Sequence, residues 1–258
     1  MEARRTRARP ALMYRNLNAD KIVETAQEVR GNIAERFPES GLSRVAAELV
    51  SVSEHAGALS LWLRQPHVPL RFLAGLGILL VITIVVGTLA SVKFQPTFSS
   101  IAEFLQGSEA AINEVVFLGI AIVFLVTMET RLKRRRALKA VHVLRSIAHI
   151  IDMHQLTKDP ERVAVPAPRP TAGAKRRLTP SELVRYLDYC SDLLAIISKV
   201  AALYVQKFDD PVTLVAVNEV ENLTNGLSRK IWQKIMILDR ILAPAGQPYV
   251  LSAAEPEA

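Results

Sequence analysis

Four polar residues in the second half of the chain are spaced so that they share one face of a predicted helix. They are His142, Arg145, His149 and Asp152, at intervals of three, four and three residues, and such residues are neighbours on a helix surface. Two imidazoles and a carboxylate can bind a divalent metal or titrate together near neutral pH. The guanidinium of Arg145 lies among them and would repel a bound metal cation, and the spacing does not match HExxH. A polar surface that faces solvent or a partner is therefore the simpler interpretation, and we assign no metal and no cofactor.

A carboxylate inside an apolar run is the second candidate position. Glu114, next to Asn113, lies about one turn inside residues 110–130, which read AAINEVVFLGIAIVFLVTMET. Ionisable groups at membrane depth commonly belong to ion or proton pathways. A carboxylate near the end of a span can instead reach the water at the interface, and we keep both interpretations. We expect Glu114 to be the sole carboxylate within the lipid depth.

The sequence gives little support to catalysis. The single cysteine, Cys190, excludes an internal disulfide and a site with several cysteines. It falls in an apolar helical pattern, and residues 179–242 contain no histidine that could activate it, so we expect a core residue. The chain has no P-loop, no GxGxxG and no nucleophile elbow. We therefore expect a protein that is not an enzyme.

The elements that carry these residues include two runs long enough to cross a bilayer, which needs about 20 apolar residues. Residues 70–92 form the first predicted transmembrane helix, and the stretch from Phe72 to Val92 has no ionisable group. Residues 110–156 form the second, which continues without a glycine or proline after Gly119 into a cytosolic extension. Between them, residues 93–109 form a short predicted outer loop.

Positive charge predicts the orientation of the two spans. A basic cluster follows the second span, whereas the loop between the spans has one lysine. Because Lys and Arg are retained on the cytoplasmic side, both termini are predicted to be cytoplasmic, in a bacterial-type inner (plasma) membrane. No secretory signal peptide precedes the first run. The cluster consists of Arg131, Lys133, Arg134, Arg135, Arg136 and Lys139.

The remaining segments are predicted as helical hairpins joined by irregular chain. Residues 18–65 form the first hairpin, with a turn at Pro38. Residues 179–242 form the second, which begins with Thr179 and Glu182 as a capping box and turns before Pro211. The regular 3,4 spacing of their apolar residues is the spacing of packed helices. Residues 1–17 are predicted to be a disordered basic arm, 160–178 a Pro/Ala linker and 243–258 a disordered tail.

Together these patterns predict an all-α protein with two spans and helical cytosolic flanks. The functional hypothesis is a non-enzymatic scaffold or signalling component that self-associates or binds a helical protein partner. The alternative is an oligomeric ion pathway or membrane-permeabilising effector with two spans per subunit. The net charge of +7 is concentrated beside the spans and at the N-terminus. This placement favours the bilayer and its anionic lipid head groups over nucleic acid as a partner.

Overall fold

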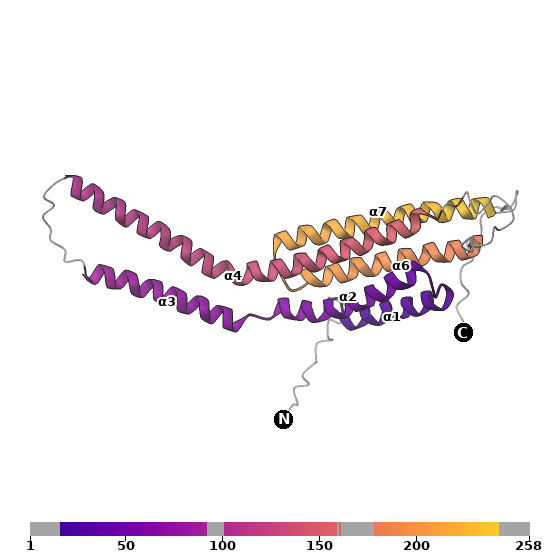
Figure 1. Ribbon diagram of the computed structural model, residues 1–258, viewed down its shortest axis with the longest axis horizontal. Helices are drawn as coiled ribbons and strands as arrows, with labels where there is room; N and C mark the ends of the chain where they lie inside the picture. The colour runs from indigo at the N-terminus through magenta and orange to yellow at the C-terminus, as the bar shows by residue number, and fades with distance from the viewer. Residues whose placement is uncertain (1–15, 92–100, 159, 161–177, 243–258) are drawn as a thin grey trace, which may run out of the picture. The chain divides into compact units, whose positions relative to one another are not determined.

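The computed structural model describes residues 16–91, 101–158, 160 and 178–242, and throughout these ranges the regular secondary structure is helical (Figure 1). The predicted all-α fold is thereby confirmed at the level of secondary structure. Most of the predicted arm, linker and tail lies outside the described residues. The helices are α1 (Ala19–Arg36), α2 (Gly41–Arg64), α3 (Val68–Ser91), α4 (Ile101–Leu156), α6 (Pro180–Val205) and α7 (Pro211–Leu242).

Short polar residues begin these helices as the sequence predicts. The side chain of Asn18 accepts a hydrogen bond from Asp20 N at the start of α1. At α6 the capping box is complete: Thr179 Oγ1 accepts from Glu182 N, and Glu182 accepts from Thr179 N. At α7 the carboxylate of Asp210 accepts from Thr213 N at 2.9 Å. Each cap satisfies a backbone donor that would otherwise have no partner.

Helix α4 begins earlier than predicted. We expected a loop over residues 93–109 and a helix from residue 110, whereas α4 starts at Ile101 and runs without interruption to Leu156. Gly107 lies inside this first part, and a single glycine costs a helix only about 1 kcal/mol, which is too little to end it. Residues 101–109, which the sequence places in the loop, are therefore the first part of α4.

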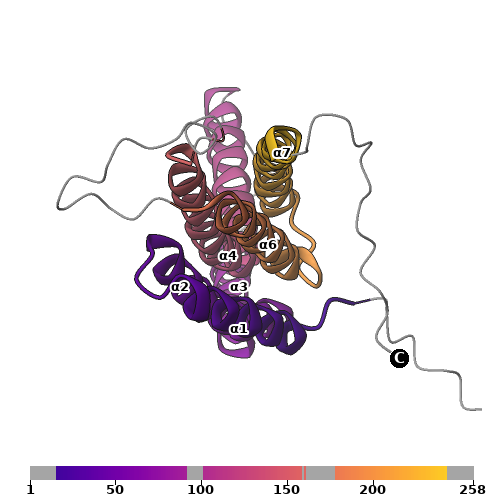
Figure 2. The ribbon, with the colours of Figure 1, turned by 90° about the vertical axis from the view of Figure 1, so that its right-hand side faces the viewer.

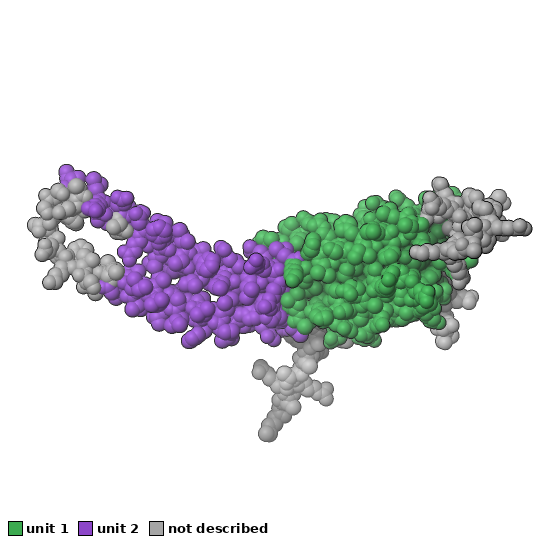
Figure 3. All heavy atoms as spheres, viewed as in Figure 1, with its two compact units in different colours: residues 1–60, 139–258 green, residues 61–138 purple. Residues whose placement is uncertain are grey.

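The chain divides into two compact units, residues 1–60 with 139–258 and residues 61–138 (Figure 3). In the first unit, α6 is the central helix, with α1, α2, α7 and the last part of α4 around it (Figure 2). Leu187, Leu194 and Ile197 follow the 3,4 spacing that predicts the packed face of this helix, and all three are fully buried. The helix also buries Leu193 and Ile196, outside that face, because it packs against more than one neighbour. The apolar surface of α6 is thus largely covered by the neighbouring helices of the first unit.

Cys190 is part of this core, as predicted. Its side chain is fully buried, and burial raises the pKa of the thiol to about 12. A thiol that stays protonated at neutral pH is a poor nucleophile and a poor metal ligand. Cys190 therefore packs as a small apolar residue.

The second unit contains the two apolar runs, and its apolar side chains are largely uncovered. Both runs are long and apolar enough to cross a membrane, and none of the residues in their most apolar windows is buried within the protein. Phe72 and Phe117, for example, are 74% and 72% exposed. A soluble protein rarely exposes continuous apolar surface of this extent.

Helices α3 and α4 approach each other closely at Gly77. A Cβ added to Gly77 would lie 3.0 Å from Leu125 Cδ1, so the two helices approach closely there. At Gly87, by contrast, an added Cβ would meet nothing within 4 Å. A Cβ at Gly226 of α7 would likewise meet nothing within 4 Å.

Two glycines of the first unit give a matched test of this packing. A Cβ on Gly41 would overlap the His154 ring, whereas Gly226 has open space. We expect Gly41→Ala to destabilise the protein by about 1–3 kcal/mol through overpacking. Gly226→Ala should stabilise it by up to about 1 kcal/mol, because alanine favours the helix.

Thermal unfolding followed by circular dichroism measures both effects. Combining Gly41→Ala with His154→Ala should recover most of the loss, because the overlapping ring is then absent. If Gly41→Ala were as stable as the unmodified protein, the packing of His154 on the start of α2 would be wrong.

Candidate functional site

The most densely bonded charged group of the second unit is Glu129, in the apolar half of α4. Its carboxylate accepts hydrogen bonds from Arg71 Nε at 2.7 Å, Lys133 Nζ at 2.9 Å and the backbone N–H of His67 at 3.2 Å. Lys133 also donates to the carbonyl of Gln65 at 2.9 Å. We call these five residues the Glu129 cluster. The Glu129 and Lys133 side chains are only 15% and 9% exposed, so their charges are held largely away from water.

The turn between α2 and α3 positions the donors of this cluster. Helix α2 ends at Arg64, and Pro66 and Pro69 prevent it from continuing. Helix α3 begins at Val68, with Pro69 in its first turn, where proline is tolerated. The His67 N–H is free of the helix ladder and points to Glu129, while Arg71 follows one turn later. On α4, Lys133 comes one turn after Glu129, on the same face.

Aromatic rings hold other members of the basic cluster. The guanidinium of Arg136 lies 4.3 Å from the centre of the Trp62 ring, which also packs against the His67 ring at 4.3 Å. Arg131 lies over Phe124 at 5.5 Å. Arginine binds aromatic faces through cation–π attraction and stacking. The cluster that we read as an orientation signal is thus divided between an internal ion pair, aromatic contacts and exposed cations such as Arg135 and Lys139.

Sequence reasoning missed Glu129, although it lies within the predicted span of residues 110–130. We expected Glu114 to be the sole carboxylate within the lipid depth, although residues 110–130 also include Glu129. The available signal was the spacing of Glu129 and Lys133, because acid and base four residues apart pair on a helix. The candidate positions Asn113 and Glu114 are exposed on the surface of α4.

The four-residue polar face of α4 is engaged through its charged members. Arg145 Nη1 pairs with Glu219 of α7 at 3.2 Å, and Asp152 Oδ1 accepts from Gln155 Nε2 at 2.6 Å. His142 and His149 are exposed. Across the part of the chain that the structure describes, no group of three His, Cys, Asp or Glu side chains is arranged to hold a metal ion. This face therefore acts as a polar surface with one contact to α7.

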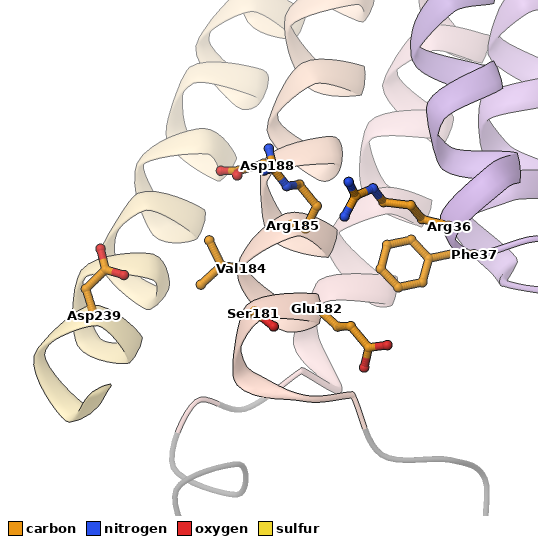
Figure 4. A pocket seen from close by; sticks show the side chains of 8 residues that line it. All are labelled: Arg36, Phe37, Ser181, Glu182, Val184, Arg185, Asp188 and Asp239. Atoms are coloured by element: carbon orange, nitrogen blue, oxygen red, sulfur yellow. The ribbon is translucent and has the colours of Figure 1, made fainter. Parts of the chain in front are cut away.

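A cavity of about 550 Å³ lies in the first unit, with α6 as its floor (Figure 4). Arg36 and Phe37 line it from the end of α1, and Asp239 lines it from α7. On α6, burial raises the pKa of Asp188, and the nearby carboxylates of Asp192 and Asp239 add to this, while Arg185 opposes it. The remaining lining residues are Ser181, Glu182, Val184 and Arg185. Carboxylates and guanidinium groups alternate around the cavity, so it has no single charge preference.

Comparison with known proteins adds no assignment: no protein-family model, no curated protein and no solved structure matches this chain. The Glu129 cluster is the feature with the most defined geometry. Its carboxylate accepts three hydrogen bonds, so most of its roughly four acceptor positions are already engaged. The arrangement is suited to joining helices rather than to transferring protons.

Removal of the Glu129 charge tests this structural role. Glu129→Gln leaves the buried Lys133 ammonium without its counter-ion, and breaking a buried pair costs about 3 kcal/mol. We expect a clearly lower melting temperature for the detergent-solubilised protein. Glu114→Gln removes a carboxylate from the same predicted span and is the matched control, for which we expect no change.

A double variant separates charge pairing from packing. Glu129→Leu with Lys133→Met leaves no unpaired buried charge, so stability should return close to the original value. Equal melting temperatures for Glu129→Gln and Glu114→Gln would contradict a stabilising role for the cluster.

The cavity gives a prediction about pH. A carboxyl group whose pKa is raised by folding destabilises the protein above that pKa, and the cost disappears below the unfolded pKa of about 3.9. Asp188→Asn should therefore raise the melting temperature at pH 7 and have no effect below about pH 4. Glu48→Gln, on the exposed surface of α2, is the control. If Asp188→Asn did not raise the melting temperature at pH 7, the Asp188 carboxylate would not destabilise the folded protein.

Proposed function

We propose that this chain is a two-span protein of a bacterial-type inner membrane, with both termini cytoplasmic, that acts as a non-enzymatic scaffold or signalling component. The observation that carries the proposal is the Glu129 cluster beside two uncovered apolar helices. The Glu129 cluster holds the start of α3 against α4 at one end of the apolar runs. A scaffold needs its helices held in a constant arrangement. The basic residues after Thr130 support the cytoplasmic placement of that end.

The proposed partners are a second copy of the chain or a helical protein, together with anionic lipid head groups. The predicted packed faces are largely occupied within the chain, so association would use other surfaces. On the last part of α4, Val143, Ile150 and Met153 lie seven and three residues apart and are 39%, 43% and 66% exposed. This is the spacing of one helix face. Such a face suits a helical partner.

An oligomeric ion pathway is the second candidate, and the exposed Glu114 is the observation that favours it. A ring of carboxylates from several subunits would attract cations. The spans otherwise contain few polar side chains, which argues against a wide aqueous channel. The two proposals differ in whether Glu114 matters for ion permeability.

Reconstitution into liposomes decides between the two proposals. For a scaffold we expect no cation flux above that of empty liposomes, and no effect of Glu114→Gln. Mass measurement of the solubilised protein should show more than one copy or a bound protein. A cation flux that Glu114→Gln abolishes would overturn the scaffold proposal.

A further inference from the structure

The cavity of the first unit is large enough for a small organic molecule. Its volume is about 550 Å³, and ligand pockets in proteins commonly measure about 300–1,000 Å³. The end of α1, the first turns of α6 and the last turn of α7 border it (Figure 4). All three helices belong to one compact unit, so the cavity is built by a single folded body.

Aromatic contacts hold the end of α1 at this cavity. Phe37 directly follows α1, and its ring meets the Tyr186 and Tyr189 rings edge to face, at centroid distances of 5.5 and 6.3 Å. Aromatic pairs at such separations stabilise a fold. Because Tyr186 is buried in α6 and Arg36 immediately precedes Phe37, these contacts place the Arg36 side chain at the rim of the cavity.

Four charged side chains around the cavity have no partner in the part of the chain that the structure describes. None of them makes a hydrogen bond or an ion pair with another described residue. In Figure 4 they follow one another from α7 to α1 in the order Asp239, Asp188, Arg185 and Arg36. The cavity thus has two carboxylates nearer α7 and two guanidinium groups nearer α1. The carboxylate of Glu182, by contrast, accepts from Thr179 N in the capping box.

The two aspartates act on the same space. Burial raises the pKa of Asp188, Arg185 opposes this rise, and the Asp192 and Asp239 carboxylates add to it. Negative charges that are close enough to raise a pKa repel each other. A positively charged group of a ligand between Asp188 and Asp239 would offset this repulsion.

We propose that this cavity binds a small zwitterion with an ammonium group and a carboxylate group, the charge pattern of an amino acid. The ammonium group lies between Asp188 and Asp239, and the carboxylate group accepts hydrogen bonds from Arg36 and Arg185. Guanidinium groups suit this role because they can donate two parallel hydrogen bonds to a carboxylate. The half-buried Val184 also lines the cavity and packs against the methylene groups of the ligand.

A ligand with a single charge fits the cavity less well. An anion would meet the two aspartates, and a cation would meet the two arginines, so each would bring like charges together. A metal ion lacks the ligands it needs, because no three His, Cys, Asp or Glu side chains among the described residues are arranged to hold one. Ligand binding at this cavity requires neither the membrane location nor the scaffold role of the proposed function.

Isothermal titration of the full chain, solubilised in dodecyl maltoside, tests the proposal with a series of ω-amino acids. Glycine, β-alanine, γ-aminobutyrate and ε-aminocaproate carry the same two charges at increasing separation. Butylamine and butyrate are the matched controls, because each carries only one of these charges. We expect at least one ω-amino acid to bind with a dissociation constant of about 1 mM or below, and both controls to bind about tenfold more weakly or not at all.

Variants assign the binding to the cavity. Asp188→Asn and Arg185→Gln each remove one charged contact and should weaken binding of the best ω-amino acid about tenfold. Glu48→Gln and Arg229→Gln remove the same charges from the exposed surfaces of α2 and α7 and should leave the affinity unchanged. Because we expect Asp188→Asn to stabilise the protein at neutral pH, its loss of binding would not reflect unfolding.

Three results would overturn the proposal. The first is the absence of binding by every member of the series. The second is equal binding of butylamine or butyrate, and the third is an affinity that neither Asp188→Asn nor Arg185→Gln changes.

Discussion

The constraint on which the second unit depends is the need to neutralise Glu129. A carboxylate on an apolar helix with little access to water is costly unless charged and backbone donors surround it. Arg71, Lys133 and the His67 N–H meet this need; His67 lies in the turn before α3 and Arg71 in the first turn of α3. Their geometry sets where α3 begins beside α4. The close contact of Gly77 with Leu125 follows one to two turns further along both helices, in the same register.

Features that depend on neighbouring residues were predictable from the sequence. The caps at Asn18 and Thr179 and the break at Pro66 depend on local chemistry, and all three occur where the sequence places them. The central place of α6 was not predictable, because periodicity shows that a face is apolar but not how many helices cover it. The Glu129 cluster was missed for a related reason. Its donors Arg71, on α3, and His67, in the turn before α3, lie 58 and 62 residues away along the chain.

The basic cluster shows how one run of like charges can serve several purposes. Retention of cations on the cytoplasmic side requires only that they are present. The structure adds distinct environments: Lys133 is buried at Glu129, Arg136 lies on Trp62 and Lys139 is exposed. Lysine suits the buried site at Glu129 because its compact ammonium can donate to a carboxylate and a carbonyl together. The planar guanidinium of arginine suits the contact with the Trp62 ring. Helix joining therefore uses the same short segment that we propose orients the spans.

Charged groups from other elements contact helix α4 near Glu129 and again at its carboxyl end. Around Glu129 these come from the turn before α3 and its first turn, and at the carboxyl end Lys234 of α7 donates to the carbonyls of Gln155 and Lys158 at 2.8 and 3.4 Å. The Lys234 ammonium donates to carbonyls at the carboxyl end of α4, and its positive charge interacts favourably with the negative end of the helix dipole. Rotation of α4 by one residue, about 100°, would carry the Glu129 carboxylate away from Arg71 and the His67 N–H. Because the buried Lys133 charge also relies on this arrangement, such a movement would cost several kcal/mol. These contacts favour a role for α4 as a fixed structural element over a role that requires α4 to move.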